Sequence, residues 1–164
     1  MTKVSVKDED LVAMGEIVVR RGGGPLRTLL GSCIGVAIFE RRLQLVGLAH
    51  IVMPDSMGRS YALGKYADTA IPEIIRQLTI LAKVKRLELT AKIAGGANMF
   101  STPSSSSTTT IGEQNSMVVE DILKELRIPL LAKHLGGNAG RRMLVQAING
   151  VVQIHVVGQP MIEI

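Results

Sequence analysis

The sequence has few cysteines and aromatic residues, and each shortage excludes a kind of site. Among 164 residues Cys33 is the single cysteine, so no internal disulfide can form and a multi-cysteine metal site is excluded. Trp is absent and only two Phe and two Tyr occur, so aliphatic residues and methionine have to build the core. Scarce aromatic rings, with basic residues dispersed in short pairs, argue against nucleic-acid binding.

Long apolar runs are also missing. No segment reaches the ~20 apolar residues of a membrane-spanning helix, and the charged start MTKVSVKDED has no signal-peptide pattern. We therefore expect a cytoplasmic protein without membrane insertion. With 46% hydrophobic and 20% charged residues, the chain is predicted to fold as one domain over residues 1–164. A net charge of +5 permits an acidic protein partner.

The hydrophobic patterns predict an α+β fold, a layered sandwich of a mostly antiparallel or mixed sheet with two main helices. One helix is expected at residues 67–83, and the other at 111–126 with Met117, Val118, Ile122, Leu123 and Leu126 as its apolar positions. Asn149–Gly150 indicates a hairpin turn, and the low-complexity run 101–110 a surface loop. Strands are predicted at residues 15–20, 27–30, 34–39, 43–53, 87–94, 130–135, 142–148 and 151–157.

The segment TLLGSCI places Cys33 among small residues, and His50 follows at the end of the next apolar run. If the two runs form a hairpin, the chain returns His50 to Cys33, where an imidazole could take the thiol proton. Gly31 and Ser32 would let backbone N–H groups approach a substrate oxyanion. The alternatives stay open, because a lone cysteine is more often a small buried hydrophobe and a lone histidine a hydrogen-bonded core residue.

Five segments follow one another along the chain: TLLGSCIGVAIFE, GLAHIVMPDS, GKYADTAIPEII, KIAGGANMF and HLGGNAGRR. In their order and spacing they resemble the CheD family of chemoreceptor glutamine deamidases. The resemblance extends over residues 15–157 and favours a catalytic role for Cys33 and His50 over the structural one.

The resemblance implies an amidohydrolase that converts receptor glutamines to glutamate and releases ammonia. The family's nucleophile corresponds to Cys33 and its catalytic histidine to His50, with backbone N–H groups near Ser32 expected to hold the oxyanion. The implied fold is similar to the catalytic domain of deamidating bacterial toxins. Expected partners are the cytoplasmic domains of methyl-accepting chemoreceptors and a CheC-type phosphatase, and no cofactor or metal is expected.

One position departs from the family pattern, which has a catalytic threonine six residues before the nucleophile. Arg27 occupies that position here, and Thr28 is its neighbour. Neighbouring strand residues face opposite sides, so Thr28 would need a shift or bulge to serve, unless a backbone carbonyl orients His50 instead. An arginine near Cys33 could also favour the thiolate.

The departure keeps two further hypotheses open. The first is a weakly catalytic or non-catalytic adaptation module that binds chemoreceptors or a CheC-type protein. The second is a thiol hydrolase that uses Cys33 and His50 on another amide or ester.

Overall fold

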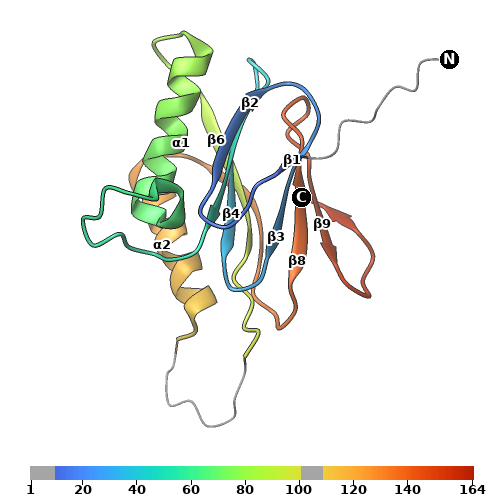
Figure 1. The fold of residues 1–164 in the computed structure, drawn as a ribbon. Helices are drawn as coiled ribbons and strands as arrows, with labels where there is room; N and C mark the ends of the chain where they lie inside the picture. Colours follow the sequence, from blue (N-terminus) through green and yellow to red (C-terminus); the bar gives the residue numbers. More distant parts are fainter. Residues whose placement is uncertain (1–9, 101–108) are drawn as a thin grey trace, which may run out of the picture.

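The computed structural model describes residues 10–100 and 109–164, in which ten strands form two mixed five-stranded sheets (Figure 1). Sheet A has the order β1-β3-β8-β9-β10, and sheet B the order β2-β5-β4-β6-β7. The strands of sheet A are β1 (Asp10–Leu11), β3 (Leu26–Leu30), β8 (Arg141–Val145), β9 (Val152–Val156) and β10 (Ile162–Glu163). Those of sheet B are β2 (Ile17–Arg21), β5 (Leu45–Ile51), β4 (Ile34–Glu40), β6 (Leu89–Gly95) and β7 (Leu130–Leu135).

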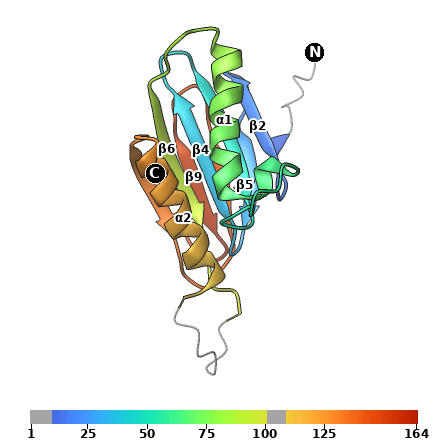
Figure 2. The same cartoon turned by 90° about the vertical axis from the view of Figure 1, so that its left-hand side faces the viewer.

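The molecule has three layers. Helices α1 (Ala67–Ala82) and α2 (Ile111–Glu125) cover one face of sheet B, and sheet A packs on its other face (Figure 2). A short 3-10 helix, η1 (Leu63–Lys65), precedes α1. No helix of the described parts of the chain is long and apolar enough to cross a membrane.

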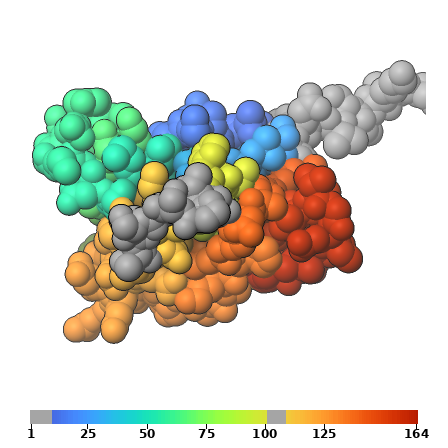
Figure 3. All heavy atoms as spheres, turned by 90° about the horizontal axis from the view of Figure 1, so that it is seen from below, coloured from blue at the N-terminus to red at the C-terminus, as the bar shows by residue number. Residues whose placement is uncertain are grey.

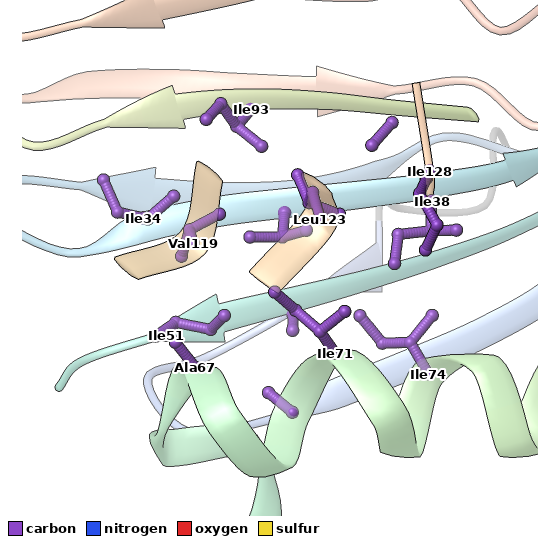
Figure 4. Close-up of a cluster of buried hydrophobic side chains, with 14 of the residues drawn as sticks. Ile34, Ile38, Ile51, Ala67, Ile71, Ile74, Ile93, Val119, Leu123 and Ile128 are labelled. Carbon is purple, nitrogen blue, oxygen red and sulfur yellow. The ribbon is translucent and has the colours of Figure 1, made fainter. Parts of the chain in front are cut away.

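Two hydrophobic cores result, one on each face of sheet B. The first lies between the helices and sheet B, where Ile71, Val119 and Ile93 meet (Figure 4). The second lies between the two sheets and contains Leu26, Phe39 and Cys33. Strands β4 and β5, in the middle of sheet B, are buried along their full length because both of their faces are covered.

The predicted α+β class with two main helices is confirmed, and the predicted strands correspond to β2 through β9. They divide between two sheets, whereas one sheet was predicted. The β4–β5 hairpin and the β8–β9 pair form as expected. The sequence patterns missed β1 and β10, which have two residues each and are too short to show a period. Residues 101–108 of the expected surface loop lie outside the described residues, and Thr110 caps α2.

The buried face of α2 differs from the predicted one. Gly112, Asn115, Val119 and Leu123 are buried, whereas Met117 is 60% exposed and Leu126 44%. Val118 and Ile122 pack only at the edge of the core. The predicted apolar positions therefore lie mostly along one side of the buried face. The buried face itself includes a polar residue, Asn115, near the start of the helix. A capping box between Thr110 and Glu113 fixes where this helix begins.

Candidate active site

Three of the residues singled out in the sequence converge in the core between the sheets. Thr28, on β3 of sheet A, is fully buried. His50, on β5 of sheet B, is 4% exposed, and Cys33, just before β4, is 8% exposed. Both sheets therefore contribute to the cluster, and its surroundings are the side chains of the inter-sheet core.

The register of the hairpin brings Cys33 beside His50. Gly35 of β4 pairs with His50 of β5, so Cys33, two residues before Gly35, is the diagonal neighbour of His50 on the same face. Diagonal neighbours in antiparallel pairs lie about 7–8 Å apart at the backbone, within reach of long side chains. The face in question is the one that packs on sheet A, because a Cβ on Gly35 would point at Met143 and Thr28.

Thr28 orients the imidazole of His50. Its Oγ1 lies 2.7 Å from His50 Nδ1 and donates to the Val12 carbonyl oxygen, also at 2.7 Å. Because the hydroxyl has one proton and the carbonyl can only accept, the Thr28 oxygen accepts from Nδ1–H. Neutral His50 then carries its proton on Nδ1, and Nε2 keeps a free lone pair. Nε2 is buried and has no protein partner in the described parts of the chain.

Arg27 occupies the position of the family's threonine, and the contact of Thr28 with His50 identifies the hydroxyl that lies against the imidazole instead. Thr28 points inward without any bulge, because β3 pairs with β8 in unbroken register from Leu26 to Leu30. The expected shift takes the form of a connection one residue shorter, since Thr28 lies five residues before Cys33 instead of the six of the family pattern, and no bulge is involved. Both a hydroxyl and a backbone carbonyl, that of Val12, take part in orienting His50.

Arg27 faces the other way. It is half-buried between the buried Leu26 and Thr28, so alternation directs it to the outer surface of sheet A. Burial raises the pKa of the Cys33 thiol. Burial, not Arg27, is the cause of this shift, so the hypothesis that Arg27 favours a Cys33 thiolate gains no support from the structure.

Burial favours the neutral forms of both Cys33 and His50. Loss of solvent raises the pKa of Cys33, because a thiolate is costly away from water. Loss of solvent also lowers the pKa of His50 from its usual 6.5, because burial disfavours the charged imidazolium. The resting pair is thus a thiol and an imidazole with an available Nε2, which suits proton transfer at the moment of attack.

The backbone at and before Cys33 is fixed by hydrogen bonds to its carbonyl groups. The Gly31 and Cys33 carbonyls accept from the N–H groups of Ala97 and Gly96, each at 2.9 Å. The Ser32 carbonyl accepts from the Asn115 side chain at 3.2 Å. Gly95 permits this close approach, since its φ is +118° and a Cβ there would collide with the Cys33 carbonyl oxygen.

Two surface hollows flank the Gly31–Ser32 segment. One, of about 600 Å³, is lined by Arg27, Leu29, Gly31, Met99, Arg142 and His155 among others. The other includes Ser32, Asn98 and Phe100. Figure 3 shows the end of the molecule where these hollows lie. The residues after β6 (yellow) lie beside the residues before β8 (orange). The Asn98 N–H donates to the Gly137 carbonyl at 2.8 Å and joins these two segments.

Sequence reasoning missed Val12 and Asn115. Val12 contributes only a backbone oxygen, which leaves no trace in a sequence. Asn115 had a weak signal, a polar residue at helical spacing from Val119 and Leu123 on a buried face. Among the described residues, no group of three or more His, Cys, Asp or Glu side chains is arranged to hold a metal ion.

Comparison with known proteins identifies the class. A sequence model of the family described as "CheD chemotactic sensory transduction" matches residues 52–156. A protein of Clostridium botulinum (strain Alaska E43 / Type E3) is 40% identical over 99% of this chain and 96% of its own length. One of Moorella thermoacetica is 40% identical over 98% of each chain. Both are named "Probable chemoreceptor glutamine deamidase CheD".

The chain therefore belongs to the CheD family. The family-model match begins two residues after His50, so Thr28, Cys33 and His50 lie outside it. They fall within the alignments to the relatives, which extend over nearly the whole chain.

Proposed function

We propose that this protein deamidates glutamine side chains of chemoreceptors, giving glutamate and ammonia, with Cys33 as nucleophile and His50 as general base and acid. The names of its relatives support the reaction. The observation that carries the assignment of residues is the 2.7 Å contact of Thr28 Oγ1 with His50 Nδ1. Because Nδ1 is bound to Thr28, Nε2 is the basic nitrogen of His50 that remains available. Cys33 and His50 lie on the same face of sheet B.

In the first half-reaction, His50 Nε2 takes the thiol proton as the Cys33 sulfur bonds to the carboxamide carbon. The carbonyl oxygen becomes an oxyanion. When the tetrahedral intermediate collapses, the carbon–nitrogen bond breaks, and the proton on Nε2 goes to the departing nitrogen. Ammonia leaves, and a thioester joins Cys33 to the substrate. His50 is again neutral.

In the second half-reaction, His50 Nε2 takes a proton from water while the water oxygen attacks the thioester carbon. The carbon–sulfur bond breaks, and the Cys33 sulfur recovers its proton from Nε2. The product is the glutamate side chain. Thr28 and the Val12 carbonyl act throughout by holding Nδ1–H, and they touch no reacting atom.

Backbone N–H groups at Ser32 and Cys33 are the proposed oxyanion donors, with Gly31 leaving room beside them. This proposal is supported by the hydrogen bonds that hold the Gly31 and Ser32 carbonyls. A trans peptide directs its N–H opposite to its C=O, so fixing these carbonyls also fixes the directions of the Ser32 and Cys33 N–H groups. Donors held in place before the reaction stabilise charge that develops in the transition state.

The proposed substrate is the cytoplasmic part of a methyl-accepting receptor, and a net charge of +5 suits an acidic helical surface. Cytoplasmic location, action as one domain over residues 1–164 and binding of a CheC-type phosphatase belong to the same proposal. So does a fold relationship to deamidating toxins. The reaction itself uses no cofactor in this mechanism.

The test is incubation with a receptor cytoplasmic fragment and detection of Gln-to-Glu conversion by peptide mass spectrometry. We expect conversion by the wild type and none by Cys33→Ala or His50→Ala. Binding of the fragment should persist in both variants.

The second candidate function, a non-catalytic adaptation module, was motivated by Arg27 and predicts another outcome. The wild type would bind the fragment without converting it. Conversion by Cys33→Ala at the wild-type rate would exclude the thioester mechanism.

A further inference from the structure

Asn115 stands out because it is a fully buried polar side chain on a helix that faces the hydrophobic core. Its Nδ2 donates to two backbone carbonyls, that of Ser32 at 3.2 Å and that of Val52 at 3.0 Å. Ser32 precedes Cys33, and Val52 follows His50 by two residues. One side chain from α2 thus links the two segments that carry the reacting groups.

Stability alone does not account for this residue. Hydrogen bonds between neutral groups stabilise a fold only modestly, whereas a buried polar atom without a partner destabilises it by a comparable amount. Asn115 Oδ1 is such an atom, since it is buried and has no partner in the described parts of the chain. The two effects nearly cancel, so the definite contribution of the amide is geometric.

The geometry concerns the peptide between Ser32 and Cys33. It is trans, so its N–H is directed opposite to the Ser32 carbonyl and hence away from Asn115. Within the described residues no acceptor is found for the Cys33 N–H, while the Cys33 carbonyl is bound to Gly96 N–H. Holding the Ser32 oxygen therefore sets the direction of a free donor on the nucleophile itself.

We propose that Asn115 is a positioning residue for the reaction: it aims the Cys33 N–H at the developing oxyanion and fixes this peptide relative to the end of β5. The inference rests on the proposed function, because it assumes that Cys33 attacks a carboxamide. Asn115 acts through the Ser32–Cys33 peptide and touches no substrate atom.

The decisive variant is Asn115→Leu, which has nearly the same shape and removes both N–H donors. The Ser32 carbonyl then loses its donor, and the peptide can rotate. Removing an oxyanion donor costs about 10²–10³-fold in kcat, so misdirecting one should cost about 10- to 100-fold. KM should stay unchanged, because the donor acts in the transition state. Asn115→Ser, which retains one donor, should give an intermediate kcat.

A second measurement separates positioning from loosening of the fold. Alkylation of Cys33 by a small neutral reagent needs the thiol but no oxyanion donor, so its rate should match the wild type in Asn115→Leu. A side chain that only held the structure together would, when changed, expose the buried thiol and speed alkylation. Ser116→Ala is the matched control, because it removes a hydroxyl bonded within α2 to the Gly112 carbonyl.

A wild-type kcat in Asn115→Leu would overturn the proposal, and so would a lowered kcat accompanied by faster alkylation. If Asn115→Leu does not fold, Asn115→Ser decides by the same two measurements. A wild type that alkylates at Cys33 but never converts glutamine would overturn the proposed function together with this inference. An active wild type with an equally active Asn115→Leu would overturn the inference alone.

Discussion

The Thr28 hydroxyl accepts from His50 Nδ1–H, and this single contact sets the tautomer of the proposed base. We predict that Thr28→Val lowers kcat by about 10- to 100-fold, less than the full 10²–10⁴-fold of general acid–base catalysis, because the imidazole remains. Thr28→Ser keeps the hydroxyl and should retain most activity. Steady-state kinetics on a receptor fragment measures both, and equal rates for Val and wild type would contradict the assignment.

The lowered pKa of His50 predicts a pH dependence of stability. Below the usual value of 6.5 the unfolded chain binds a proton that the folded protein excludes. The contribution of neutral His50 is therefore complete above 6.5 and is lost as pH falls toward the lowered folded pKa. Urea unfolding between about pH 8 and pH 5 should show this loss. His50→Asn should lack this component, and an identical pH profile in the variant would contradict the prediction.

The residues of the site differ in how far a sequence can predict them. The proximity of Cys33 and His50 could be predicted, because a hairpin of two apolar runs has a local register. The pattern alone left both residues open to a structural role, and their proposed roles come from the resemblance to the CheD family. The contact of Thr28 could not be predicted, since it joins strands of different sheets and depends on one residue of loop length. Val12 contributes a backbone oxygen, for which residue identity carries no information. The side chain of Asn115 binds backbone oxygens of segments that are distant in the sequence, so its partners could not be predicted.

At the scale of elements, the two sheets approach each other closely at Gly35. A Cβ there would lie 2.6 Å from Met143 Sδ, 3.0 Å from Leu30 Cδ1 and 3.4 Å from Thr28 Cγ2. Methionine is flexible and can yield in part, but the sheets would have to separate. Thr28 would then move away from His50.

We therefore predict that Gly35→Ala lowers the free energy of unfolding by about 1–3 kcal/mol, as overpacking does, and lowers kcat as well. Chemical denaturation and the deamidation assay measure the two effects. Gly24→Ala is the control, because nothing lies within 4 Å of a Cβ at Gly24. Full activity in Gly35→Ala would mean that the contact between the sheets tolerates displacement.

Helices and strands could be predicted where the spacing of their apolar residues is regular. Helix α1 buries Ile71, Ile74 and Leu78 at the spacing expected. Its counterpart α2 was found, but its face was misjudged, because the polar Asn115 interrupts the apolar stripe. The division of the strands between two sheets could not be predicted, since pairs such as β3 with β8 are distant in the chain.

At the scale of the whole molecule, sheet B belongs to both cores. We predict that Leu78→Ala, in the core under the helices, and Leu26→Ala, in the core between the sheets, each cost about 2–5 kcal/mol. Each should shift one common transition, because neither core can persist without sheet B. Circular dichroism and hydrogen exchange during denaturation test this.

Ile80→Ala is the control for these core substitutions, since its side chain is 61% exposed. Two separate transitions in either core variant would contradict the single domain proposed for residues 1–164. Loss of activity before loss of secondary structure would indicate that the sheets come apart first.

The burial of Cys33 has a consequence beyond catalysis. Peroxide reacts with thiolates, and a thiol whose pKa is raised and which is 8% exposed presents little thiolate to it. The protein should therefore resist conversion to the sulfenic acid during oxidative stress. Such resistance would let chemoreceptor adaptation continue in a cell whose exposed, acidic thiols are already oxidised.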